Sequence, residues 1–141
     1  MPLEASPSGP TRWPWGNAAS VYEEIGGDAG VRRLVDHFYD IIERDSPLLR
    51  DMLGASTAGS RQKLYEFLSG WMGGPPLYWE RRGHPALRMR HARFSIDAEA
   101  ADQWSTCMRA AIVSSAIPDP PASWLGDELA RVADVLRNQP N

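Results

Sequence analysis

The sequence predicts an all-α protein, and two observations support this. Apolar side chains recur at intervals of three and four residues in four separate stretches, which is the period of an amphipathic helix. No stretch shows a convincing alternation of apolar and polar residues, the pattern of a half-buried strand, and no internal repeat is visible. With 141 residues, 43% of them hydrophobic and 23% charged, the chain has the size and composition of one globular domain.

Charge and cysteine content disfavour several classes of protein. Fifteen Lys and Arg against eighteen Asp and Glu give a formal net charge of −3, which argues against a dedicated nucleic-acid-binding protein. No apolar run approaches the roughly 20 residues that cross a bilayer, and no secretory signal is visible, so we expect no membrane association. The single Cys107 excludes an intrachain disulfide and a cysteine-based zinc finger, which favours a reducing cytoplasm.

Residues 1–19 are expected to form a Pro-rich N-terminal extension, with the folded domain covering residues 20–141. Proline removes amide donors and blocks helix formation, and the extension holds Pro2, Pro7, Pro10 and Pro14. Whether Trp13 and Trp15 within it pack onto the domain or stay exposed is left open.

Four long helices are expected from the apolar spacing. The apolar positions are Val31, Leu34, Val35, Phe38, Ile41 and Ile42; Leu64, Phe67, Leu68, Trp71 and Met72; Trp104, Cys107, Met108, Ala111 and Ile112; and Leu129, Val132, Ala133 and Leu136. Side chains that can accept hydrogen bonds from the free amides of a first turn precede each stretch. The expected N-caps are Asp28, Ser56 or Thr57, Asp97, and Asp119 or Ser123.

Residues 73–83 are expected to form an extended loop, since they include three glycines and two prolines. Pro85 then suits the first turn of a short helix that ends near His91. A structureless stretch of this length is unusual inside a compact domain unless something holds it, and a large prosthetic group could do so.

His91 is the candidate metal ligand among the three histidines. It is flanked by Arg88, Arg90 and Arg93, whose charges favour the neutral imidazole that binds a metal. One histidine without carboxylate or cysteine partners cannot hold zinc or a non-haem iron. It can hold a haem iron, because the porphyrin supplies the other four ligands. On spacing alone, a structural histidine is an equally good interpretation.

Tyr39 and Trp104 are candidates for the other side of such an iron. Tyr39 follows the core residue Phe38, so its hydroxyl can point into a cavity at the edge of the core. The indole N–H of Trp104 can only donate. Each donor would stabilise a bound ligand with partial negative charge by about 1–2 kcal/mol. Taken singly, neither residue indicates a function, because Tyr and Trp at the edge of a core usually serve packing.

In combination, these residues give the chain a resemblance to the truncated haemoglobins, and within them to the second group. The resemblance runs from Tyr22 to about Asn138. The motifs that carry it are Phe38-Tyr39, the run from Arg61 to Pro75, the run from Gly83 to His91, and Gln103-Trp104 followed by Cys107-Met108. It implies a two-over-two helical sandwich around a haem, with the loop at 73–83 replacing most of the F helix.

The resemblance also implies the roles of individual residues. His91 would be the proximal iron ligand, with Tyr39 and Trp104 as distal ligand-stabilising residues. Ser60 and Leu64 fall at the distal positions of the second long helix. The residues expected beside the haem propionates are Tyr78, Arg88 and Arg90, and those expected to line the apolar pocket are Leu77, Phe94, Met108 and Trp71.

The chain departs from the family at one distal position. The family places Phe, Tyr or His beside the haem after the B helix, whereas local alignment puts Leu53 there, or Met52 with a one-residue slip. Leucine offers neither a hydroxyl nor an imidazole. Tyr39 and Trp104 would therefore supply the hydrogen bonds, unless Ser60 or a water helps, and we expect an altered ligand off-rate and altered haem retention.

The leading hypothesis is a protein that carries haem b (iron protoporphyrin IX) and binds O2, CO, NO or similar ligands at a five-coordinate iron. Oxygen storage is its least committed form, and NO- or peroxide-detoxifying redox activity would need a reductase that the sequence does not name. Slow O2 release, caused by hydrogen bonds from Tyr39 and Trp104, favours chemistry or sensing over oxygen transport. Whether the protein forms a homodimer is left open. The alternative is a haem-free helical interaction module that docks partners on a Trp-rich surface containing Trp13, Trp15 and Trp79.

Overall fold

The computed structural model describes residues 20–92 and 94–139, and within these residues the chain is helical without any strand. The helices are α1 (Val21–Glu24), α2 (Gly27–Asp45), α3 (Pro47–Leu53), α4 (Ala58–Trp71), α5 (Leu77–Arg82), α6 (Leu87–His91), α7 (Ala98–Ser114) and α8 (Pro121–Val135). The all-α prediction is therefore confirmed. The expected extension over residues 1–19 lies outside the described residues, so it stays a prediction.

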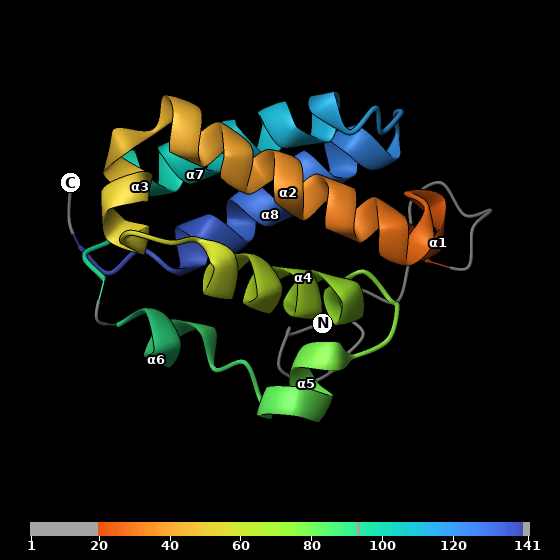
Figure 1. The fold of residues 1–141 in the computed structure, drawn as a ribbon, viewed down its shortest axis with the longest axis horizontal. Helices are drawn as coiled ribbons and strands as arrows, with labels where there is room; N and C mark the ends of the chain where they lie inside the picture. The colour runs from red at the N-terminus through yellow and green to blue at the C-terminus, as the bar shows by residue number, and fades with distance from the viewer. Residues whose placement is uncertain (1–19, 93, 140–141) are drawn as a thin grey trace.

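The four long helices pack against one another in a fixed order. α2 lies between α4 and α7, and α7 packs along α8 (Figure 1). The short helices α5 and α6 lie on the side of α4 that faces away from α2 (Figure 1). The segment with the candidate ligand His91 is thus held outside the pairs formed by the long helices.

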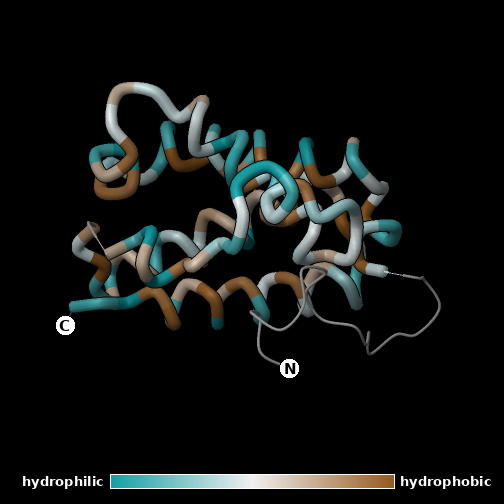
Figure 2. Tube along the Cα trace, turned by 90° about the horizontal axis from the view of Figure 1, so that it is seen from below, coloured by the Kyte–Doolittle hydropathy of each residue, from teal (hydrophilic) through white to brown (hydrophobic). Residues whose placement is uncertain are grey.

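The core lies where α2, α7 and α8 meet. Phe38 and Leu34 of α2, Met108 of α7 and Leu129 of α8 are all buried. Hydrophobic and hydrophilic residues alternate along the helices, as expected where each helix turns one face inward (Figure 2). Most residues of the predicted apolar stripes are buried. Four pack against the core while staying partly exposed: Leu64, Trp104, Val132 and Leu136.

Side chains and glycines set the helix ends, but not all of the predicted N-caps hold. Thr57 is the N-cap residue of α4 but makes no capping hydrogen bond. The N-cap of α8 is Pro120, and neither Asp119 nor Ser123 takes that position, although Asp119 accepts the N–H of Ser123 at 2.9 Å. Asp97 caps α7 as predicted, because its Oδ1 accepts the backbone N–H of Ala100 at 2.9 Å. Asp28 does not cap α2, because α2 already begins at Gly27. The N-cap residue is Gly26, which has a left-handed φ of 108°. Asp28 instead lies in the first turn and pairs with Arg32.

The prediction of an extended loop over residues 73–83 is wrong in part, because Leu77–Arg82 forms α5. α4 does end at the glycine pair, where the N–H of Gly74 donates to the carbonyl of Ser69 at 2.8 Å. The new helix then forms because its arginines are fixed by a carboxylate of α4, a long-range contact described below. Pro85 precedes α6 and does not lie in its first turn, since α6 begins at Leu87.

Candidate functional site

His91 ends α6 and is half-buried. Its Nδ1 lies 2.7 Å from the carbonyl oxygen of Leu87, one turn earlier. A carbonyl can only accept, so Nδ1 carries a proton in this contact, and in the neutral form of the ring the lone pair lies on Nε2. No hydrogen-bond partner of Nε2 is found among the described residues. In metal sites a histidine commonly donates from one ring nitrogen to a carbonyl and binds the metal through the other, so Nε2 is the nitrogen that could bind one.

The segment that follows His91 is fastened by the C-terminal part of the chain. The side-chain amide of Asn138 donates to the carbonyl of Phe94 at 2.8 Å, and its Oδ1 accepts the N–H of Ile96 at 2.9 Å. The ring of Phe94 lies 6.2 Å from the imidazole of His91. Sequence analysis did not find this role of Asn138, because nothing local marks a contact over 42 residues.

Tyr78, Arg88 and Arg90 lie on α5 and α6. The Arg90 guanidinium sits 5.6 Å from the centre of the buried Tyr78 ring and donates to backbone carbonyls. The Nε of Arg88 donates to the carbonyl of Val135. In the described part of the chain, no carboxylate lies within 4.0 Å of either guanidinium, so both positive charges are available to an acidic ligand.

Two neighbouring arginines are already paired with Glu66. This carboxylate of α4 is only 2% exposed and accepts from Arg82 Nε at 2.6 Å, from Gln62 at 2.8 Å and from Arg81 at 3.2 Å. Burial by itself raises the pKa of the Glu66 carboxyl, but these hydrogen bonds outweigh burial and lower the pKa to about 2. Glu66 therefore stays ionised and fixes α5 to α4. Sequence analysis missed it, because an acidic residue between Tyr65 and Phe67 carries no local signal.

Tyr39 of α2 links Ser60 of α4 and, through the neighbouring Phe38, Trp104 of α7. The buried Tyr39 hydroxyl donates to the carbonyl of Ser60 at 3.3 Å. The ring of Phe38 lies 5.0 Å from both the Tyr39 and the Trp104 rings. Burial raises the pKa of the Tyr39 phenol above its ordinary value, so its proton is retained. Trp104 is only partly buried against the core, and its indole N–H can donate but not accept.

The predicted apolar residues fall into two sets. Met108 and Trp71 are fully buried, and Trp71 packs on Trp124 with 5.7 Å between ring centres. The others remain partly exposed while packing against the core; they are Leu53, Leu64, Leu77 and Phe94. The described residues therefore offer one imidazole, two guanidinium groups without a carboxylate partner and several partly exposed apolar side chains.

These features fit an iron porphyrin, which is flat, apolar and carries two propionates. They do not fit a metal ion held by side chains alone, because the described residues contain no group of three or more His, Cys, Asp or Glu side chains that could hold one. The chemistry of the available groups thus matches the predicted haem better than any metal bound directly by the protein.

The alternative of a Trp-rich docking surface gains no support from the described tryptophans. Trp79 stacks on Phe67 at 5.7 Å, and Trp104 and Trp124 also pack on aromatic rings. Trp13 and Trp15 lie outside the described residues. No helix in the ranges 20–92 and 94–139 combines the length and the hydropathy needed to cross a bilayer.

Residues 20–138 match the model of the family described as bacterial-like globin. The group 2 truncated hemoglobin YjbI of Bacillus subtilis is 42% identical over 91 residues, which cover 64% of this chain and 67% of that protein. The group 2 truncated hemoglobin 3-1 of Lotus japonicus is 53% identical over 98 residues, which cover 68% of this chain but only 58% of the Lotus protein.

Solved structures show the same likeness. The group II truncated hemoglobin from Bacillus anthracis overlaps with a TM-score of 0.84 at 31% identity, over 88% of this chain and 100% of that one. A cold-adapted truncated hemoglobin from Pseudoalteromonas haloplanktis TAC125 overlaps with a TM-score of 0.82 at 37% identity, over 85% and 98% of the two chains. These overlaps confirm the predicted two-over-two helical sandwich.

Proposed function

Because the chain belongs to the bacterial-like globins, and within them to the group II truncated haemoglobins, we propose that it holds haem b through His91 and binds O2 and other diatomic ligands. The observation that carries this proposal is the contact of 2.7 Å between His91 Nδ1 and the carbonyl of Leu87, which directs the lone pair to Nε2. Family membership implies a haem cofactor. Haem, when bound, supplies an iron with one position for an imidazole and one for a small ligand.

The proximal side would hold the propionates through Arg88 and Arg90, with Tyr78 beneath Arg90. Arg88 and Arg90 are proposed for this role because the other two arginines of α5 and α6, Arg81 and Arg82, already form ion pairs with Glu66. The partly exposed Leu64, Leu77 and Phe94 would cover the apolar faces of the macrocycle and exclude water.

The distal side would retain a ligand mainly through Trp104, which packs on Phe38, stays partly exposed and has an N–H that can only donate. Leu53 adds no polar group at the position where the family usually has an aromatic residue or histidine. The NO- or peroxide-detoxifying reactions would use this same pocket, together with an external electron donor.

Absorption spectroscopy tests the proposal. The full chain is mixed with hemin and passed through a gel-filtration column. We expect a Soret band that travels with the wild-type protein and that His91→Ala abolishes. His37→Ala, which removes a partly exposed imidazole from α2, is the matched control and should keep the band. A colourless wild-type protein, or an unchanged band in His91→Ala, would contradict the proposal.

A further inference from the structure

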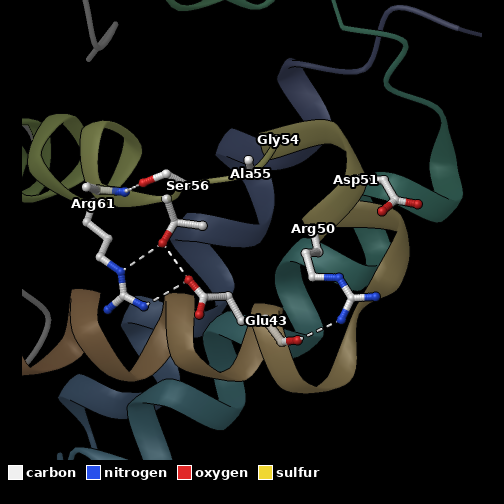
Figure 3. A pocket seen from close by; sticks show the side chains of 9 residues that line it. Glu43, Arg50, Asp51, Gly54, Ala55, Ser56 and Arg61 are labelled. Carbon is white, nitrogen blue, oxygen red and sulfur yellow. Dashed lines mark hydrogen bonds and ion pairs between the residues drawn. The ribbon is translucent and has the colours of Figure 1, made fainter.

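The start of α4 is fastened to α2 by Arg61. Its NH2 group donates to Asp40 at 2.8 Å and to Glu43 at 3.2 Å, and its NH1 group donates to Asp36 at 3.2 Å. Its Nε donates to the hydroxyl of Thr57, the N-cap residue of α4, at 3.0 Å. Figure 3 shows the Arg61 side chain reaching from α4 toward Glu43 on α2, at one end of an open pocket. One guanidinium thus joins three carboxylates and the cap residue.

Arg61 is an ion-pair partner of all three carboxylates, and Glu43 also accepts a hydrogen bond from the hydroxyl of Thr57. Asp36, Asp40 and Glu43 are spaced by four and three residues, so they lie on one face of α2. In the described ranges, none of them has an ion-pair partner other than Arg61. Without Arg61, three negative charges would face the start of α4 and repel one another. The contact between α2 and this end of α4 would then loosen.

Ser60, the residue before Arg61, provides the acceptor for Tyr39. The Tyr39 hydroxyl donates to the Ser60 carbonyl at 3.3 Å, and Tyr39 lies on the buried side of α2, next to Asp40 in the sequence. The Arg61 guanidinium also lies 5.6 Å from the centre of the Tyr39 ring. A phenol has a single proton, so a hydroxyl that donates to Ser60 cannot donate to a bound ligand as well.

We propose that Arg61 is a positioning residue that holds the Ser60 carbonyl within hydrogen-bond distance of the Tyr39 hydroxyl. The phenolic proton is then not available to a ligand on the distal side. This inference rests on the proposed function, since it assumes a ligand held near Tyr39 and Trp104. While the ion pairs of Arg61 are intact, Trp104 alone would donate a hydrogen bond to the ligand. Breaking these ion pairs frees the phenol to turn to the ligand.

The test measures O2 dissociation from the haem-loaded full chain. We expect Arg61→Gln to slow O2 release about fivefold, because one neutral hydrogen bond to the ligand is gained. In a Tyr39→Phe background the same substitution should change nothing. A purely structural role of Arg61 predicts faster release, and predicts it in both backgrounds. Arg61→Lys keeps the charge but not the planar fork, so it should restore wild-type release only in part.

Two further measurements make the test independent of ligand release. Amide hydrogen exchange of the haem-free protein should be faster in the first turn of α4 in Arg61→Gln than in wild type. The C–O stretching band of the CO adduct should shift toward a more strongly hydrogen-bonded form in Arg61→Gln. The matched control is Arg109→Gln, which breaks an exposed ion pair with Asp127 between α7 and α8 and should alter neither measurement.

The outcomes separate the two proposals. If the wild-type protein binds no haem, the proposed function and this inference both fail. If it binds haem but Arg61→Gln leaves O2 release and the CO band unchanged, or changes them equally in the Tyr39→Phe background, only the role of Arg61 is overturned.

Discussion

The buried carboxylate of Glu66 on α4 receives the Nε–H of Arg82 on α5 at a distance of 2.6 Å. α5 has only six residues, far fewer than the roughly 12–15 that an isolated helix needs in water. Its position therefore depends on contacts with α4. Through this ion pair, the helix that carries Leu64 fixes the helix that carries Tyr78 and Leu77.

We predict that Glu66→Gln lowers the free energy of unfolding by about 1–3 kcal/mol, because charge-assisted hydrogen bonds to two arginines are weakened at a buried site. Urea denaturation measures this loss. Glu128→Gln is the control, because Glu128 pairs with the exposed Arg131 at the surface of α8 and should cost less than about 1 kcal/mol. Equal losses in the two variants would show that burial of Glu66 adds nothing.

The pH dependence of stability should also reveal Glu66. Its pKa in the folded protein is about 2, below the ordinary 4.5, so the folded state favours the ionised form. The stabilisation is therefore complete above pH 4.5 and is lost as the pH falls toward 2. We expect the stability difference between wild type and Glu66→Gln to shrink over this range. A difference that stays constant from pH 5 to pH 2 would refute the assignment.

Arg88→Ala and Arg90→Ala should each weaken haem retention, because each removes a guanidinium that has no carboxylate partner among the described residues. We expect haem to be lost about 5–20 times faster to an excess of a haem-scavenging apoprotein, as for a partly exposed charged hydrogen bond. Arg32→Ala removes an arginine of α2 that is paired with Asp28, and should retain haem as wild type does. If all three variants lose haem at the same rate, the propionate contacts are not where we place them.

Trp104→Phe should speed O2 dissociation by about tenfold, because it removes a hydrogen bond worth on the order of 1–2 kcal/mol to the ligand. Tyr39→Phe should have a smaller effect, since the Tyr39 proton is directed at Ser60. Stopped-flow measurements on the haem-loaded protein give both rates. A fast off-rate that Trp104→Phe leaves unchanged would remove Trp104 from the distal site.

Ala86→Gly should stabilise the protein by about 0.5–1 kcal/mol, because Ala86 has a φ of 45° in the left-handed region that strains residues with a Cβ. Thermal denaturation measures the change. Ala92→Gly is the matched control, since Ala92 has an ordinary helical φ of −61° and should lose stability on the same substitution. Destabilisation by both substitutions would mean that Ala86 is not strained.

Much of the helical frame was predictable because it follows from local sequence. The apolar stripes of α2, α4, α7 and α8 carry their own period, and Asp97 caps α7 through an amide only three residues away. The end of α4 at Gly73-Gly74 is also local. His91 could be singled out because its neighbours are basic and the chain offers few other ligands.

Tertiary structure decided what the sequence left open, because the deciding contacts join residues far apart in the chain. Arg61 reaches residues 18 to 25 positions earlier on α2, Glu66 reaches Arg82 16 positions later, and Asn138 reaches Ile96 across 42. Contacts over such distances in the chain produce no repeating pattern in the sequence, so the sequence alone does not reveal these pairs. α5 was therefore missed, since so short a helix forms only when another helix holds it, and the direction of the Tyr39 proton was set by where the packing of α4 places the Ser60 carbonyl.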